Sequence, residues 1–136
     1  MRIVAVDYGE RRTGVAVSDE LGITAQGQET IEVVDESELL RRVVCITEEL
    51  KAEKVVIGLP LNMDGSESEK SGKVRKFGAE LEKIIKTPVV FWDERMTSMQ
   101  AKRVMREMEI KTRKNKLLID KISATLILQE YLKTII

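Results

Sequence analysis

Carboxylates stand at three points of the chain where the surrounding pattern is apolar. Asp7 directly follows the apolar run 3–6, and the pair Asp93 and Glu94 directly follows another, VVFW. Asp120 lies on the apolar face of the last helical pattern. A buried carboxylate is costly unless a cation or a hydrogen-bond donor pairs with it. Oxygen ligands of this type select Mg2+ or Mn2+ over zinc, so the pattern predicts a divalent-metal site suited to phosphoryl transfer.

Each of these acids also has a structural alternative. Asp7 could accept backbone N–H groups of a turn, and the other acids could cap the first turn of a helix. Convergence of all three on one site would favour metal binding over three separate structural roles.

The composition narrows the chemistry further. The 136 residues include no histidine, which removes the usual general base, the usual zinc ligand and the usual partner of a nucleophilic Ser or Cys. The formal net charge is zero, yet residues 95–121 contain nine Lys or Arg against three acids, a net charge of +6. Such a run is either a solvated helical face or a phosphate-binding surface, and its position beside the candidate acids favours phosphate binding.

Hydrophobic patterning predicts a single α/β domain, 1–136. Expected strands cover 2–7, 13–18, 24–33, 55–58 and 89–92. Expected helices cover 35–54, capped by Asp35 or Ser37, a segment from a Ser66–Glu69 capping box through Ile85, and residues about 97–108 and about 116–134. We expect a five-stranded mixed sheet of order 3-2-1-4-5, flanked by helices, with the first, fourth and fifth strands parallel.

This strand order would bring the acids together. Ligands collect beyond the carboxyl ends of parallel strands, where Asp7, Gly58 and the Asp93–Glu94 pair are expected. The first and fifth strands have one neighbour between them, a gap of about 9–10 Å that suits two divalent ions between carboxylates. The last helix would add Asp120 at the same edge.

Two further features concern the cellular environment. Cys45 stands between Val44 and Ile46 in a helical pattern, so we expect a small buried hydrophobic side chain rather than a nucleophile. The N-terminal apolar run is too short for a signal peptide, and no stretch is long enough to cross a bilayer. We therefore expect a cytoplasmic protein with no membrane partner.

Four blocks of the sequence resemble, in order and spacing, the signature blocks of the YqgF family, the Holliday junction resolvases also described as pre-16S ribosomal RNA nucleases. The blocks are DYGERRTGVAVSD (7–19), GLPLNMDG (58–65), DERMTSMQA (93–101) and DKISATLILQEYL (120–132). One mild departure is Lys121–Ala124, where two adjacent alanines are commoner in the family. The resemblance spans the chain and implies a ribonuclease H-like fold with metal-dependent hydrolysis of a phosphodiester in structured nucleic acid.

The resemblance also implies roles for individual residues. The catalytic and metal-binding acids would be Asp7, Glu94 with Asp93 beside it, and Asp120. They would hold two Mg2+ or Mn2+ ions, one activating a water and the other stabilising the leaving 3′ oxygen. Because adjacent strand residues face opposite sides, only one of Asp93 and Glu94 can point into the site, and we choose Glu94.

Four more residues are candidates for substrate contact. Arg95, Lys114 and Lys116 could grip flanking phosphates, and Asn62 stands in the loop GLPLNMDGSES, which could contact the substrate. An ion pair with Asp93 is an equally good role for Arg95. Asn62 could instead satisfy the backbone of its own loop.

Three functions remain open from the sequence. The first is a nuclease, with 5′ processing of pre-16S rRNA preferred and resolution of branched DNA as the alternative. The second is a non-catalytic RNA-binding module in ribosome assembly or transcription. The third is an ATPase, because the acid-Tyr-Gly turn also resembles the phosphate-binding hairpin of the actin and hexokinase group, although one lobe of this size lacks the opposite wall. A monomer and a dimer both remain open, since a four-way junction favours a dimer and an RNA end needs none.

Overall fold

Five strands form one mixed sheet, and their order confirms the sequence prediction. The computed structural model describes residues 1–33 and 35–135, with strands β1 (Ile3–Asp7), β2 (Arg12–Ser18), β3 (Ala25–Glu32), β4 (Lys54–Leu59) and β5 (Val89–Asp93). The sheet order is β3-β2-β1-β4-β5. β2 pairs antiparallel with β1 and β3, whereas β4 runs parallel to β1 and β5. The carboxyl ends of β1, β4 and β5 therefore share one edge.

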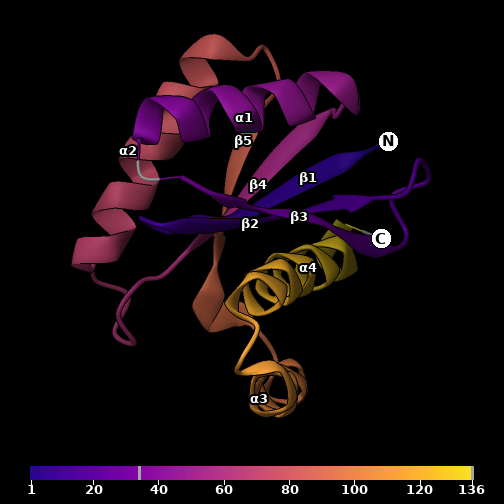
Figure 1. The fold of residues 1–136 in the computed structure, drawn as a ribbon, viewed down its shortest axis with the longest axis vertical. Coiled ribbons are helices and arrows are strands. Elements are labelled where there is room, and N and C mark those ends of the chain that lie inside the picture. Colours follow the sequence, from indigo (N-terminus) through magenta and orange to yellow (C-terminus); the bar gives the residue numbers. More distant parts are fainter. Residues whose placement is uncertain (34, 136) are drawn as a thin grey trace.

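Helices cover both faces of this sheet (Figure 1). α1 (Glu36–Glu49) and α2 (Glu69–Ile84) lie on one face, and α4 (Lys116–Ile135) packs on the other. α3 (Met99–Thr112) follows a 3-10 turn at Glu94–Met96 and packs against α4, on the side away from the sheet. Within the described ranges, no helix combines the length and the apolar character needed to cross a membrane.

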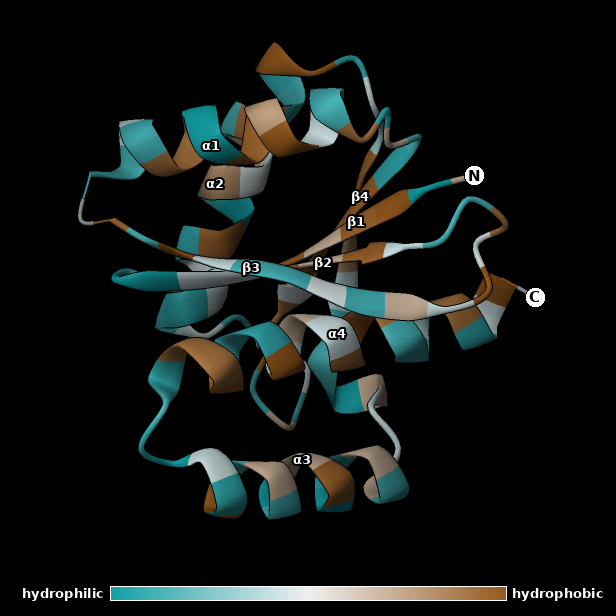
Figure 2. Cartoon of the chain, turned by 45° about the vertical axis from the view of Figure 1, so that its right-hand side comes forward, coloured by the Kyte–Doolittle hydropathy of each residue, from teal (hydrophilic) through white to brown (hydrophobic). Residues whose placement is uncertain are grey.

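β1 is buried on both faces, which explains its uninterrupted apolar run. Val4 and Val6 belong to the core beneath α1 and α2, whereas Ile3 and Ala5 belong to the core beneath α4. Figure 2 shows β1 and β4 as mainly apolar, whereas the edge strand β3 is largely polar. Asp7 is thus the first polar residue at the end of a strand that has no exposed face.

A glycine sets the distance between β2 and α4. A Cβ atom on Gly14 would stand 2.0 Å from the carbonyl oxygen of Asp120, so the two backbones can approach this closely only with glycine. Gly14 is also the register partner of Asp7 across the β1–β2 pair. This contact therefore places the backbone of Asp120 beside the strand end that carries Asp7.

The start of α2 differs from the prediction. Its N-cap is Ser68, whose hydroxyl accepts the N–H of Ser71, while the Ser71 hydroxyl accepts the N–H of Ser68. The predicted capping box of Ser66 and Glu69 is wrong because the preceding turn already uses Ser66. Its N–H and hydroxyl both donate to the carboxylate of Asp64.

The predicted start of the first helix is confirmed, but the helix ends earlier than predicted. Asp35 is the N-cap, since its carboxylate accepts the N–H of Ser37. α1 ends at Glu49 rather than at residue 54, because Lys51 adopts the left-handed backbone conformation with φ of 52°.

The expected burial of Cys45 is wrong. Val43 and Ile46 of α1 face the sheet and are buried, whereas Cys45 points to the opposite side of the helix and is exposed. Its thiol donates a hydrogen bond to Glu49. The apolar neighbours in the sequence misled the prediction, because successive residues of a helix are about 100° apart around its axis.

Replacing Gly14 tests the close packing of β2 and α4. Gly14→Ala drives a Cβ into the Asp120 carbonyl, so the free energy of unfolding should fall by about 2–4 kcal/mol, measured by urea denaturation. Gly72→Ala is the matched control. Gly72 is an exposed residue within α2 with open space around it, and alanine there should stabilise the protein by about 0.5–1 kcal/mol. Equal effects of the two substitutions would contradict the packing argument.

Candidate active site at the carboxyl ends of the strands

Asp7 and Glu94 line one cavity of about 460 Å³ at the carboxyl ends of the parallel strands. Asp7 ends β1, and Glu94 is the first residue after β5. Between these strands, Gly58 of β4 lies beside the glutamate and beneath α4: a Cβ at that position would stand 2.7 Å from Ile127 Cδ1 and 3.4 Å from the Glu94 carboxyl carbon. The cavity continues between α2, α3 and α4, and its lining includes three cationic side chains, Lys70, Lys102 and Arg106.

The surroundings of these two carboxylates disfavour their charge. Burial, followed by the charge of Glu94, raises the pKa of Asp7 from 3.8 to about 7. Burial also raises the pKa of Glu94, while the ammonium group of Lys70 acts to lower the pKa of both acids. Two carboxylates that face one partly dehydrated cavity are stabilised by a bound cation. The donor set of Asp7 and Glu94 therefore fits a divalent metal ion.

The adjacent side chains of Asp93 and Glu94 have different surroundings, as expected for successive residues at a strand end. Asp93 accepts the backbone N–H of Arg95 at 3.0 Å and forms an ion pair with the Arg95 guanidinium, Nη2 to Oδ2, at 2.7 Å. The hydrogen bonds from Arg95 lower the pKa of Asp93. Asp93 thus caps the 3-10 turn, and it is Glu94 that faces the cavity.

Asp120 reaches the same edge, but its carboxylate has another partner. The Nε of Arg12 donates to its Oδ2 at 2.9 Å, and both side chains are partly buried. Its charge adds to the raised pKa of Asp7, yet Asp120 does not line the cavity. Across residues 1–33 and 35–135, no group of three acidic or cysteine side chains is arranged to hold a metal ion. The fold therefore brings two of the three predicted ligands into the cavity and pairs the third with β2.

The predicted substrate contacts take two different forms. Arg95 is bound to Asp93 and also donates to the carbonyl of Met63 at 3.3 Å, which ties the loop after β4 to the 3-10 turn. Asn62 donates to the Ser66 hydroxyl and to the carbonyl of Glu67, so both side chains have the structural partners named as alternatives. Neither residue lines the cavity of Asp7 and Glu94.

Lys114 and Lys116 differ from these, because they stand at the connection between α3 and α4 and are exposed. Neither forms an ion pair with any described residue. They lie outside the cavity of Asp7 and Glu94, so any contact with nucleic acid would be made at a distance from the carboxylates.

Two residues of the site were missed by sequence reasoning. Lys70 lies in the first turn of α2 and lines the cavity. The sequence signal that was missed is the N-cap at Ser68, which places Lys70 at the start of this helix. Glu130 of α4 is 6% exposed and accepts the backbone N–H of Ser98 at 3.0 Å, at the N-cap of α3. Lys133 donates to the other oxygen of the same carboxylate at 2.7 Å. Glu130 thus anchors the chain that follows Glu94, and its position three residues after the buried Ile127 and directly before the buried Tyr131 was the sequence signal for its burial.

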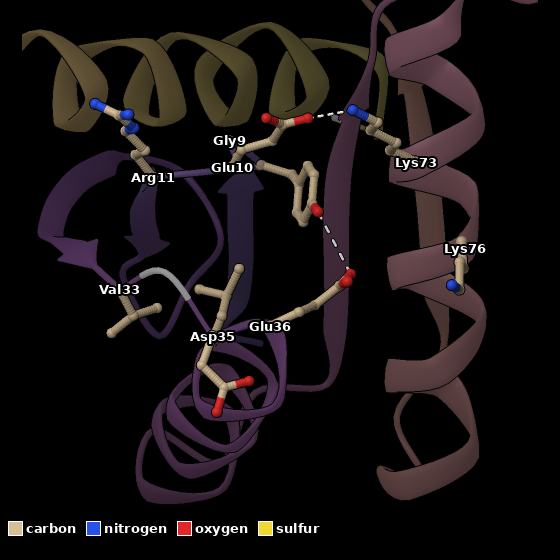
Figure 3. Close-up of a pocket in the computed structure, with 10 residues that line it drawn as sticks. Gly9, Glu10, Arg11, Val33, Asp35, Glu36, Lys73 and Lys76 are labelled. Atoms are coloured by element: carbon tan, nitrogen blue, oxygen red, sulfur yellow. Dashed lines mark hydrogen bonds and ion pairs between the residues drawn. The ribbon is translucent and has the colours of Figure 1, made fainter.

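A second cavity of about 460 Å³ lies between the β1–β2 turn, α1 and α2 (Figure 3). Two contacts join residues of its lining: Lys73 pairs with Glu10, and the Tyr8 hydroxyl donates to Glu36 at 3.4 Å. Asp7, Glu94 and Asp120 do not line it. Asp7 and Glu94 share the first cavity, and neither carboxylate has an ion-pair partner among the described residues, so that cavity is the candidate for hydrolysis.

Comparison with known proteins decides the family. A model of the RuvX family, described as Holliday junction resolvase, matches residues 1–134. The chain belongs to the RuvX family. The resemblance seen in the four sequence blocks is confirmed, and nuclease chemistry is the function class that this family represents.

Relatives of this RuvX protein match it over nearly its whole length. A protein of Halothermothrix orenii named as a pre-16S rRNA nuclease is 45% identical over 97% of this chain and 94% of its own length. A protein of Dictyoglomus thermophilum with the same name is 41% identical over 97% of this chain and 95% of its own length.

Solved structures confirm the ribonuclease H-like fold. RuvC of Thermus thermophilus in complex with a Holliday junction matches with a TM-score of 0.62 at 15% identity, covering 98% of this chain and 96% of RuvC. The fowlpox virus resolvase, in complex with its Holliday junction DNA, matches with a TM-score of 0.62 at 14% identity, covering 100% of this chain and 99% of the resolvase. At these identities the likeness is one of fold.

Asp7→Asn should change the stability of the metal-free protein in a pH-dependent way. The folded pKa of Asp7, about 7, exceeds its ordinary value of 3.8, so its favourable contribution is complete below the ordinary value and is lost as pH rises through 7. In EDTA, the substitution should therefore raise the free energy of unfolding by roughly 1–3 kcal/mol at about pH 8 and leave it nearly unchanged at about pH 4.

Urea denaturation at the two pH values measures this difference. Asp93→Asn is the control of opposite sign, because the pKa of Asp93 is lowered and its ionised form stabilises the fold. A stability gain for Asp7→Asn that is the same at both pH values would contradict the burial of the charge.

Proposed function

We propose that this RuvX protein is a divalent-metal-dependent nuclease, with pre-16S rRNA as its preferred substrate and cleavage near the 5′ end. The observation that carries the proposal is the placement of Asp7 and Glu94 in one cavity at the strand ends, with cationic side chains around them. The names of the relatives support the choice of ribosomal RNA. Association with ribosome assembly and a cytoplasmic location belong to the same proposal.

The chain's own residues would prepare the site in two ways. Asp7 and Glu94, and Asp120 once it is free, would hold Mg2+ or Mn2+. When bound, such an ion lowers the pKa of a water and stabilises a developing oxyanion. Lys70, Lys102 and Arg106 would bind phosphate oxygens around the cleaved bond and neutralise charge there. Arg95, Lys114, Lys116 and Asn62 remain proposed contacts to flanking nucleotides, which add affinity without reading sequence.

Resolution of a four-way DNA junction is the second candidate. The description of the RuvX family favours it. A non-catalytic RNA-binding role would keep the same surface without cleavage. Incubation of the protein in Mn2+ with a 5′-extended 16S rRNA precursor and, separately, with a four-way DNA junction distinguishes the three outcomes. Size-exclusion chromatography with light scattering decides between a monomer and a dimer.

Substitution of the cavity carboxylates should abolish cleavage. Asp7→Asn and Glu94→Gln each remove one negative oxygen donor, and we expect the rate of cleavage to fall by at least about 100-fold in saturating Mn2+. Asp93→Asn is the matched control, because its carboxylate pairs with Arg95 and lies outside the cavity, so its rate should stay within about fivefold of the parent.

Circular dichroism and thermal melting verify that all three variants are folded. If Asp7→Asn cleaves as fast as the parent, the site is elsewhere. If Asp93→Asn abolishes cleavage while Glu94→Gln remains active, Asp93 rather than Glu94 is the acid required for cleavage.

Lys70→Met tests the cation on α2. Loss of the ammonium group removes a phosphate contact and also the charge that opposes metal binding by Asp7 and Glu94. The rate of cleavage should therefore fall about tenfold while Mn2+ binds more tightly, as followed by isothermal titration calorimetry. Lys76→Met, on the same helix but in the second cavity, is the control and should change neither quantity. Unchanged cleavage by Lys70→Met would exclude the phosphate contact.

A further inference from the structure

We propose that Arg12 is a positioning residue that controls when Asp120 joins the metal site. In the free protein Arg12 holds Asp120 outside the cavity of Asp7 and Glu94. When a nucleic-acid phosphate takes the guanidinium, the carboxylate is released to the cavity. The inference rests on the proposed nuclease function and explains how Asp120 would join Asp7 and Glu94 only when substrate is present.

The geometry of the ion pair leaves Arg12 ready for a second partner. Only its Nε is used, donating to Asp120 Oδ2 at 2.9 Å, and its two NH2 groups have no hydrogen-bond partner in the described part of the chain. The side chain is 31% exposed, at the start of β2. A guanidinium binds phosphate through two parallel N–H donors, which is a stronger arrangement than a single contact to a carboxylate.

The pair is not what holds α4 to the sheet. The contact of Gly14 with the Asp120 backbone and the buried residues Ala124 and Leu128 already fix this helix. Exchange of the partner of Asp120 therefore needs only a side-chain rotation. The distance to travel is short, because the Asp120 backbone lies against Gly14, the register partner of Asp7.

Charge explains why the exchange would depend on the substrate. Without a cation, the charge of Asp120 acts against the charge of the buried Asp7, and pairing with Arg12 relieves this repulsion. A phosphate that binds Arg12 removes this counter-ion, so a metal ion becomes the best partner of the carboxylate. By linkage, metal binding would strengthen phosphate binding to the same degree.

The first experiment measures Mn2+ affinity of the free protein by isothermal titration calorimetry, without nucleic acid. Arg12→Met frees Asp120 and should tighten Mn2+ binding by about fivefold or more. The double variant Arg12→Met with Asp120→Asn should lose this gain and bind like Asp120→Asn alone. Arg42→Met, which removes a cation from the separate ion pair with Glu29, should bind Mn2+ like the parent.

The second experiment measures nucleic-acid binding in the absence of metal. In EDTA, a fluorescent four-way DNA junction should bind more tightly to Asp120→Asn than to the parent, because the guanidinium is free, and Arg12→Met should cancel this gain. Neither measurement depends on cleavage.

Three results would overturn the proposal. Mn2+ affinity of Arg12→Met equal to or below that of the parent shows that Arg12 does not withhold Asp120, while Mn2+ binding by the parent leaves the nuclease proposal standing. A gain that persists in the double variant is a charge effect unrelated to Asp120. Absence of Mn2+ binding by both the parent and Arg12→Met, with no cleavage of RNA or DNA, overturns the nuclease proposal together with this one.

Discussion

The cost of burying the charge of Asp7 governs the arrangement of the site. β1 is covered by helices on both faces, so its last residue enters a region with little water. An ionised carboxylate in that position requires compensation, which is why its pKa is raised to about 7. The neighbouring acid at the end of β5 increases this cost. A bound cation would be the simplest compensation, and the fold places Asp7 and Glu94 together in one cavity where such a cation could bind.

Two glycines allow α4 to pack closely on the sheet. Gly14 on β2 lets the backbone of α4 come against the strand, and Gly58 of β4 leaves space for Ile127 of α4, whose Cδ1 would stand 2.7 Å from a Cβ at that position. A side chain at either position would therefore collide with α4. The position of the helix that carries Asp120 depends on the absence of side chains at these two strands.

Charged side chains fix the position of the segments that follow β4 and β5. Asp93 and Arg95 close the turn that carries Glu94, and Arg95 ties that turn to the loop after β4. Glu130 of α4 anchors the N-cap of α3 at Ser98. These contacts show that some charged residues near the candidate site act on the backbone.

Local patterns in the sequence predicted the strands, the helices and the sheet order and singled out the candidate acids, because hydrophobic periodicity and the placement of a polar residue after a buried run are set by neighbours along the chain. The four blocks also identified the family. Tertiary structure alone decided that Asp93 caps a turn while Glu94 faces the cavity, that Asp120 pairs with Arg12, and that Lys70 enters the site. The exposure of Cys45 and the position of the α2 cap at Ser68 were likewise decided by the folded structure. Each of these outcomes depends on which side chain meets which partner across the fold, and such contacts arise between residues far apart in the sequence, where no local pattern records them.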